Sequence, residues 1–434
     1  TLAPSMNMKQ NSRPIIISIL FSLFVGLLVS IIVNVLPHEL TDMRLCDTWF
    51  GSDIPRRYDA LTNRFSYNGD AFKHPFFQLL FIPARVAMAI LRCEPWNALS
   101  VLLFLNAILW SNLVWYILYR ITRRILDTTI YGLLLASTAA TLLWLPVVET
   151  YAFGSTSILI AIAVLVTPTL RFNALAQAIA LVFSAAITIT NAMFGIIAVV
   201  LSWKSLKTAL FIAFAIAFFA LGAIGSKRLF PNAKSYLAPQ KVYSSINEDL
   251  SFFARIKPIN KYVSDFIVQP LMPRFVFAGE IPKHYSHVRG DWWWPANRLP
   301  VIDKHRSIAN VSYQLIHASN PALWTVATTL WFAILIAGMA SAFALKDDLF
   351  LRIAIPAGIL GQFALHFVYG HETAIYELHW MPSLIFLAAL SSRTKMRGPC
   401  LFVSIIVALL CFYNNAVMLR QLIRYIGGIN IYAL

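Results

Sequence analysis

Long apolar stretches, separated by short polar or basic segments, recur along most of the chain. An α-helix needs about 20 mostly apolar residues to cross a bilayer. The short segments of alternating polarity that are typical of membrane β-barrels do not occur in the sequence. We therefore predict an all-α polytopic membrane protein with about eleven transmembrane helices, at residues 14–36, 98–118, 128–147, 152–166, 174–188, 192–201, 209–224, 322–345, 353–368, 381–390 and 400–414.

Residues 76–91 form a further apolar stretch, which is short and contains Pro83 and Arg85. We interpret it as an interfacial or re-entrant helix on the outer face of the membrane. If it crossed the membrane, the basic cluster of Arg120, Arg123 and Arg124 would move outside, against the positive-inside rule.

The basic residues Lys9 and Arg13 before the first span predict a cytoplasmic N-terminus. With this orientation every short basic loop falls on the cytoplasmic side. The chain then divides into a cytoplasmic N-terminus at 1–13, with 1–5 before Met6 expected to be a cloning remnant, an N-terminal transmembrane module at 14–226 with an outer loop at 37–97, a large extracytoplasmic segment at 227–321, and C-terminal transmembrane helices at 322–434.

The composition agrees with the pattern, because 59% of the residues are hydrophobic and only 12% are charged. Soluble domains carry roughly 25% charged residues. A net charge of +16 can indicate nucleic-acid binding. Here the Lys and Arg residues lie in short clusters between the spans, as membrane topology requires. We therefore expect membrane lipids, and no nucleic acid, among the partners.

Charged residues concentrate in the first outer loop, where six of the 19 acidic residues fall between Glu39 and Asp70 among several arginines. A dense mixture of charges beside a membrane is costly unless it serves a function. This loop is therefore our candidate site.

Four short motifs occur in order along the chain. They are Gly-Ser-Asp-Ile-Pro-Arg at 51–56, His-Pro-Phe-Phe at 74–77, Pro-Val-Val-Glu-Thr-Tyr-Ala-Phe at 146–153 and Glu-Thr-Ala-Ile-Tyr-Glu-Leu-His-Trp at 372–380. Together with the odd span count, they resemble the GT-C fold of integral membrane glycosyltransferases. By size and character the chain is similar to the serotype-converting glucosyltransferases of O-antigen lipopolysaccharide.

This resemblance implies a hexosyltransferase of the bacterial inner (cytoplasmic) membrane whose active site faces the periplasm. The donor would be a polyprenyl-phosphate sugar, and the acceptor a glycan or a lipid-linked molecule. An acid in the first outer loop would deprotonate the acceptor hydroxyl, and the sugar would transfer with inversion. Several GT-C enzymes carry paired acids, whereas Asp53 has no acidic neighbour in the sequence.

Asp53 is the first candidate for the general base, which must lie within hydrogen-bond reach of the acceptor hydroxyl. The alternative is a helix cap, because Ser-Asp before Pro is typical of a helix start. Asp47, Asp59 and Asp70 are the other candidates in the loop, and Asp70 is also a candidate substrate ligand.

Arg56 and Arg57 are candidate ligands of the donor phosphate, because guanidinium groups offer paired donors to phosphate oxygens. They could equally bind lipid headgroups or pair with Asp53. His74 is a third phosphate candidate, and its alternative is a helix start with Pro75 in the first turn.

Further substrate-binding candidates come from two later outer turns. Glu149 and Tyr151 lie between two spans, where the alternative for Glu149 is a helix cap. Glu372, Tyr376 and His379 are spaced to share a helix face, and Glu372 is the second catalytic candidate.

Trp293, in the run Gly-Asp-Trp-Trp-Trp-Pro at 290–295, is a candidate sugar contact or an interfacial anchor. His371 and His379 lack a tight metal-ligand spacing, so we expect no cofactor, with a divalent metal as the alternative. A disulfide between Cys46 and Cys93 is feasible in an oxidising compartment. The alternative functions are a transporter or flippase of lipid-linked saccharides, or a non-enzymatic assembly subunit.

Overall fold

The computed structural model describes residues 12–43, 49–50, 52–68, 73–202, 206–233, 259–273, 321–345, 349–368 and 374–427. Within these ranges every regular element is a helix, which confirms the all-α class. Six of the described helices are long and apolar enough to cross a membrane. They are α1 (Ser12–Val35), α4 (Pro95–Thr122), α11 (Leu206–Leu229), α16 (Pro321–Ala344), α17 (Leu349–Val368) and α19 (Arg397–Gly427).

Shorter helices occupy the other predicted spans. They are α5 (Ile125–Ala136), α7 (Thr150–Val166), α9 (Ala174–Ile187), α10 (Ala192–Ser202) and α18 (Glu377–Ala389). Each predicted stretch thus contains a helix, while the number that cross the membrane stays a prediction. The turn predicted between the fifth and sixth spans is confirmed as the 3-10 helix η4 (Ile189–Asn191).

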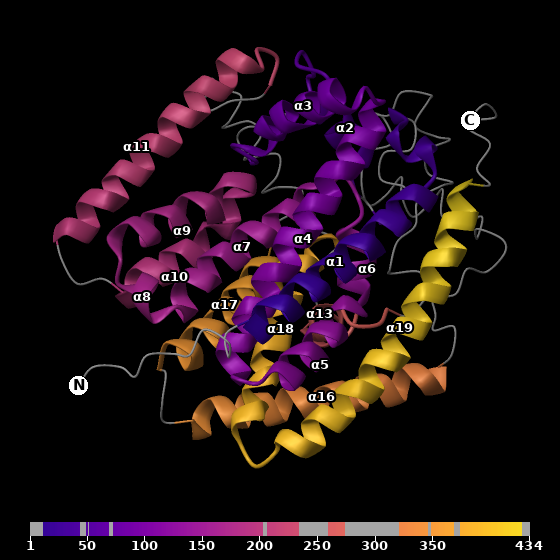
Figure 1. Cartoon of the computed structure of the whole chain (residues 1–434), viewed down its shortest axis with the longest axis vertical. Coiled ribbons are helices and arrows are strands. Elements are labelled where there is room, and N and C mark those ends of the chain that lie inside the picture. Colours follow the sequence, from indigo (N-terminus) through magenta and orange to yellow (C-terminus); the bar gives the residue numbers. More distant parts are fainter. Residues whose placement is uncertain are drawn as a thin grey trace.

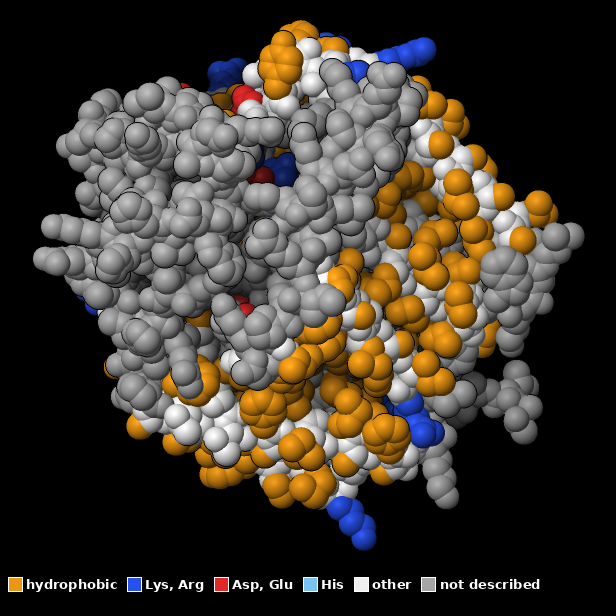
Figure 2. Space-filling view, turned by 180° about the vertical axis from the view of Figure 1, so that it is seen from behind, with side chains coloured by type: hydrophobic (Ala, Val, Ile, Leu, Met, Phe, Trp, Pro, Cys, Tyr) orange, Lys and Arg blue, Asp and Glu red, His pale blue; other side chains and the backbone are white. Residues whose placement is uncertain are grey.

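The helices pack around a central group formed by α4, α7 and α18 (Figure 1). α1 lies along α4, α9 and α10 form a hairpin against α7, and α16, α17 and α19 complete the bundle. α11 lies at the edge of the molecule, where it packs mainly on α9. The outer surfaces of α1, α11 and α19 carry many exposed apolar side chains, such as Leu20, Phe214 and Phe402. Figure 2 shows apolar side chains over most of the described surface on one face, as expected for a multi-pass membrane protein.

The predicted third span is not one continuous helix. It divides into α5 and the short helix α6 (Ala139–Trp144), because Thr138 caps α6 by accepting a hydrogen bond from the Thr141 amide. The freed carbonyl of Ser137 accepts from Asn415 Nδ2 of α19 at 2.9 Å. Side-chain donors of this kind allow a helix break inside a packed bundle.

A short helix and the turn that follows it are also packed inside the bundle. The helix α13 (Ile259–Ile267) and the turn after it lie in the segment predicted to be extracytoplasmic, and their side chains Tyr262, Phe266 and Leu271 are buried. Three indole N–H groups from other helices donate to carbonyls at its C-terminal end. These are Trp380 to Phe266 at 2.8 Å, Trp331 to Ile267 at 3.0 Å and Trp324 to Met272 at 3.0 Å.

An ion pair joins α5 and α19 at the end of the bundle that is predicted to face the cytoplasm. The carboxylate of Asp127 is fully buried, and Arg397 donates to both of its oxygens, at 2.8 and 2.7 Å. Two-point contact of this kind satisfies a charge that burial would otherwise make costly.

The first outer loop contributes two helices that lie together at one end of the bundle (Figure 1). α2 (Ile54–Thr62) packs on α3 (Phe81–Leu91), and α3 packs on α4. The predicted interfacial stretch therefore contains a helix, and its position relative to the bilayer stays a prediction. The candidate site lies where α2 and α7 begin.

Candidate functional site

Two helix starts meet at the centre of the site. Asp53 is the residue before α2, and Glu149 is the residue before α7. The Glu149 carboxylate accepts from the Thr150 amide through Oε2 at 2.7 Å and from the Asp53 amide through Oε1 at 2.8 Å. One buried carboxylate therefore caps α7 and fixes the start of α2. This confirms the cap alternative for Glu149, while its substrate role stays a prediction.

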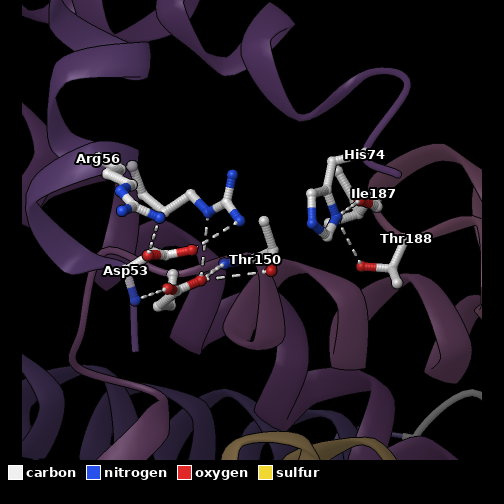
Figure 3. A network of polar contacts seen from close by, with 8 residues as sticks. Asp53, Arg56, His74, Thr150, Ile187 and Thr188 are labelled. Carbon is white, nitrogen blue, oxygen red and sulfur yellow. Dashed lines mark hydrogen bonds and ion pairs between the residues drawn. The ribbon is translucent and has the colours of Figure 1, made fainter. Parts of the chain in front are cut away.

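Two arginines on the first turn of α2 complete the charge network (Figure 3). Arg56 Nη1 lies 3.0 Å from Asp53 Oδ1, and Arg57 Nη2 lies 3.5 Å from Asp53 Oδ2. Arg57 also reaches inward, with Nε 3.6 Å from Glu149 Oε2. Asp53 stands at the cap position, but its side chain accepts from Arg56 and makes no hydrogen bond to the helix backbone.

Exposure increases from the inside of this network outward. The side chain of Glu149 is 0% exposed, Arg57 is 11%, Asp53 is 28% and Arg56 is 41% exposed. Asp53 and Arg56 are therefore the members that a substrate can reach, and Glu149 and Arg57 support them from behind. The sequence does not predict this difference in exposure, because Arg56 and Arg57 are two adjacent arginines with nothing to distinguish them.

Burial raises the pKa of the Glu149 carboxyl above its ordinary value, because a charged carboxylate loses its hydration there. The Arg57 guanidinium acts in the opposite direction, and the Asp53 carboxylate adds to the rise. Groups with shifted pKa values often occur at functional sites, although structural ion pairs shift them as well.

The chain that leads into α2 is fixed on α6. Trp49 Nε1 donates to the Leu143 carbonyl at 3.2 Å, and the Phe50 ring lies 6.0 Å from the Trp144 ring. Phe50 has a left-handed backbone with φ of 52°. This conformation is rare for a bulky residue and needs support from its surroundings, which the buried Trp49 and Phe50 side chains provide.

His74 joins the first outer loop to the break between α9 and α10. Its Nδ1 lies 2.9 Å from the Ile187 carbonyl and 3.3 Å from Thr188 Oγ1 (Figure 3). The backbone pairs in the same place, where the Phe76 amide donates to the Ala186 carbonyl. The next helical turn begins only at Phe77, the last residue of the motif, so His74 does not start a helix. Its phosphate-binding role stays a prediction.

The predicted residues at the starts of α7 and α18 also come together. The Tyr151 ring lies 5.2 Å from the Tyr376 ring and 5.9 Å from the His379 ring. The Tyr376 and His379 rings are 6.2 Å apart, so their spacing does place them side by side. All three belong to one aromatic cluster that follows directly on Glu149.

Several predicted residues lie outside the described part of the chain. They are Asp47, Asp70, Glu372, Trp293, His371 and Cys46. Their predicted roles are therefore not tested. Cys93, the described member of the disulfide that was considered feasible, is a free cysteine. Among the residues that the structure does describe, no group of three or more His, Cys, Asp or Glu side chains is arranged to hold a metal ion.

Sequence reasoning missed two residues that contact this cluster. Gly154 follows Tyr151 on α7, and Asn191 ends η4 and donates to the Gly154 carbonyl at 3.4 Å. A glycine inside an apolar helix is a signal of close packing, and Asn191 lies in the short gap between two predicted spans. Neither signal identifies the partner residue without the fold.

Comparisons of the chain with protein-family models, with curated proteins and with solved structures give no match.

Proposed function

We propose that the protein is a membrane glycosyltransferase of the GT-C type. It would transfer a sugar from a polyprenyl-phosphate donor to a glycan or a lipid-linked acceptor on the periplasmic face of a bacterial inner membrane. The multi-pass helical architecture supports access to a lipid donor. The resemblance of the short motifs to GT-C enzymes supports the reaction class.

One observation carries the proposal. The partly exposed carboxylate of Asp53 is held by Arg56 in front and by Arg57 behind. The fully buried Glu149 holds Arg57 and the Asp53 amide. Guanidinium groups bind phosphate oxygens well, and a fixed carboxylate suits a general base. The arrangement therefore offers a base and a phosphate ligand next to one another.

The chemistry would be a single displacement. The acceptor oxygen forms a bond to the anomeric carbon of the sugar, while the bond from that carbon to the phosphate oxygen breaks. The acceptor proton passes to the Asp53 carboxylate, and polyprenyl phosphate leaves with the electron pair. Attack from the side opposite the phosphate inverts the anomeric centre.

Arg56 would stabilise the charge that develops on the leaving phosphate, because it is the more exposed of the two arginines. His74 is a second candidate for this contact. Arg57 and Glu149 would be positioning residues, since they hold the Asp53 side chain and its amide.

The test is a transfer assay with the purified full-length protein in lipid nanodiscs. Polyprenyl phosphates that carry glucose, galactose, mannose or N-acetylglucosamine serve as donors, and lipid-linked saccharides serve as acceptors. We expect transfer from at least one donor, and a loss of at least 100-fold in rate for Asp53→Asn, because general bases contribute about 10²–10⁴-fold.

Asp59→Asn is the matched comparison, because Asp59 is the alternative base candidate that the structure describes, and its carboxylate accepts from Asn63 and Asn68. Its rate should stay close to that of the wild type. Full activity of Asp53→Asn would remove Asp53 as the base. Movement of the lipid donor across the bilayer without any transfer would replace the enzyme proposal by the flippase alternative.

A further inference from the structure

Three elements that are far apart in the sequence converge on Gly154 of α7. If Gly154 carried a Cβ atom, that atom would lie 2.7 Å from His379 Nε2 and 3.2 Å from Asn191 Nδ2. Both distances are shorter than ordinary packing contacts allow for carbon. The missing side chain of Gly154 therefore lets α18 and η4 approach α7 at this point.

The approach is fixed by neighbouring hydrogen bonds. Ser155 Oγ donates to the Leu378 carbonyl at 2.7 Å, and Trp110 Nε1 donates to Ser155 Oγ at 2.9 Å. These bonds hold α4, α7 and α18 together one residue away from Gly154 and His379. The position of His379 is therefore set by the helices and does not depend on a flexible loop.

Two polar atoms at this point are enclosed and lack hydrogen bonds. His379 is 2% exposed and Asn191 is 0% exposed, and neither His379 Nε2 nor Asn191 Oδ1 has a partner within the described part of the chain. A buried polar atom without a partner costs stability, and such atoms are rare in folded proteins. A pair of them around one glycine is therefore expected to have a ligand.

We propose that His379 Nε2 and Asn191 Oδ1 bind one hydroxyl group of the sugar carried by the lipid donor. This inference rests on the proposed function and adds the residues that recognise the sugar. A hydroxyl group both donates and accepts, so it can donate to the Asn191 amide oxygen and accept from the N–H of a neutral His379 ring that carries its proton on Nε2.

The neighbourhood suits a sugar. The Tyr151 ring lies 5.9 Å from the His379 ring, and aromatic rings pack well on the apolar faces of sugars. Tyr151 is two residues after Glu149, which holds the Asp53 amide. The subsite therefore adjoins the charge network in which the phosphate and the base are proposed to lie.

The experiment compares the lipid phosphate without a sugar and with each of four sugars. Binding of polyprenyl phosphate and of the four polyprenyl-phosphate sugars is measured at equilibrium in nanodiscs. For the wild type we expect at least one sugar lipid to bind about tenfold more tightly than polyprenyl phosphate, as two net hydrogen bonds allow. Gly154→Ala should reduce this ratio to near one and leave binding of polyprenyl phosphate unchanged.

Gly225→Ala on α11 is the matched control, because no atom lies within 4 Å of the Cβ position there. It should keep the wild-type ratio. His379→Phe is a second variant, which retains an aromatic ring and removes Nε2. Its preference for the sugar lipid over polyprenyl phosphate should also fall to near one, and this test remains valid if Gly154→Ala folds poorly.

The outcomes separate the two proposals. If the wild type binds polyprenyl phosphate and all sugar lipids equally, the subsite is wrong while the phosphate site stands. If Gly154→Ala and His379→Phe keep the wild-type ratio, the subsite is also wrong. If the wild type binds none of these lipids, the proposed function and the subsite both fail.

Discussion

At the scale of single residues, Glu149 shows how far a motif can be interpreted without a fold. Glu-Thr before an apolar run predicts a helix cap, and Glu149 does accept from the Thr150 amide. Its second bond, from the Asp53 amide, comes from a residue 96 positions earlier. No local pattern could predict that pairing, or that Arg57 reaches inward while Arg56 remains more exposed.

The shifted pKa of Glu149 leads to a prediction about stability and pH. Because the folded protein raises this pKa, the stabilisation from the carboxyl is fully present below its ordinary pKa, about 4.3. It is lost as the pH rises through the folded-state value. The unfolding temperature of the wild type should therefore fall relative to that of Glu149→Gln as the pH rises from 4 upward.

Thermal unfolding monitored by fluorescence across this pH range provides the measurement. Glu39→Gln is the control, since Glu39 is exposed in η1 (His38–Thr41) and the substitution should change little at any pH. If the unfolding temperature of the wild type instead rose relative to that of Glu149→Gln with increasing pH, the attraction of Arg57 for the Glu149 carboxylate would outweigh the effect of burial.

At the scale of elements, hydropathy was a good guide to where helices occur and a poor guide to where they break. The interruption at Ser137 and the inward packing of α13 both depend on side-chain donors from other helices, namely Asn415 and Trp331. A hydropathy pattern records the residues of one segment only. It therefore cannot show that backbone groups will be satisfied by distant partners.

The indole contacts to α13 can be tested with a matched pair of variants. Trp331→Phe removes the donor to the Ile267 carbonyl, and leaving a buried acceptor without a partner costs about 1–3 kcal/mol. Trp115→Phe removes a similar volume from a buried position, but Trp115 Nε1 has no partner within the described residues.

We therefore expect the unfolding free energy of Trp331→Phe to be lower than that of Trp115→Phe by about 1 kcal/mol or more. Chemical denaturation in detergent, with both variants measured against the wild type, gives this difference. Equal losses would show that the indole hydrogen bond adds nothing beyond packing.

At the scale of the whole molecule, the residues of the candidate site gather where α2 and α7 begin, and the Asp127–Arg397 pair lies at the predicted cytoplasmic end. The positive-inside rule predicts which end faces the periplasm. The helices themselves do not fix this orientation, because a bundle of apolar helices can insert either way.

Cysteine labelling decides the orientation. In a background without the four native cysteines, Tyr67→Cys places a thiol on an exposed loop beside α2, and Lys395→Cys places one on an exposed turn before α19. A membrane-impermeant maleimide added to spheroplasts should label Tyr67→Cys, and should label Lys395→Cys only after the membrane is permeabilised. The reverse pattern would place the candidate site in the cytoplasm.

The double backbone connection at the end of α9 limits how this protein can vary in length. The Phe76 amide donates to the Ala186 carbonyl, and the Ile189 amide donates to the Lys73 carbonyl, so the two segments exchange bonds in both directions. One extra residue in α9 would turn this end by about 100° and advance it by about 1.5 Å. The chain around His74 would then lose its register.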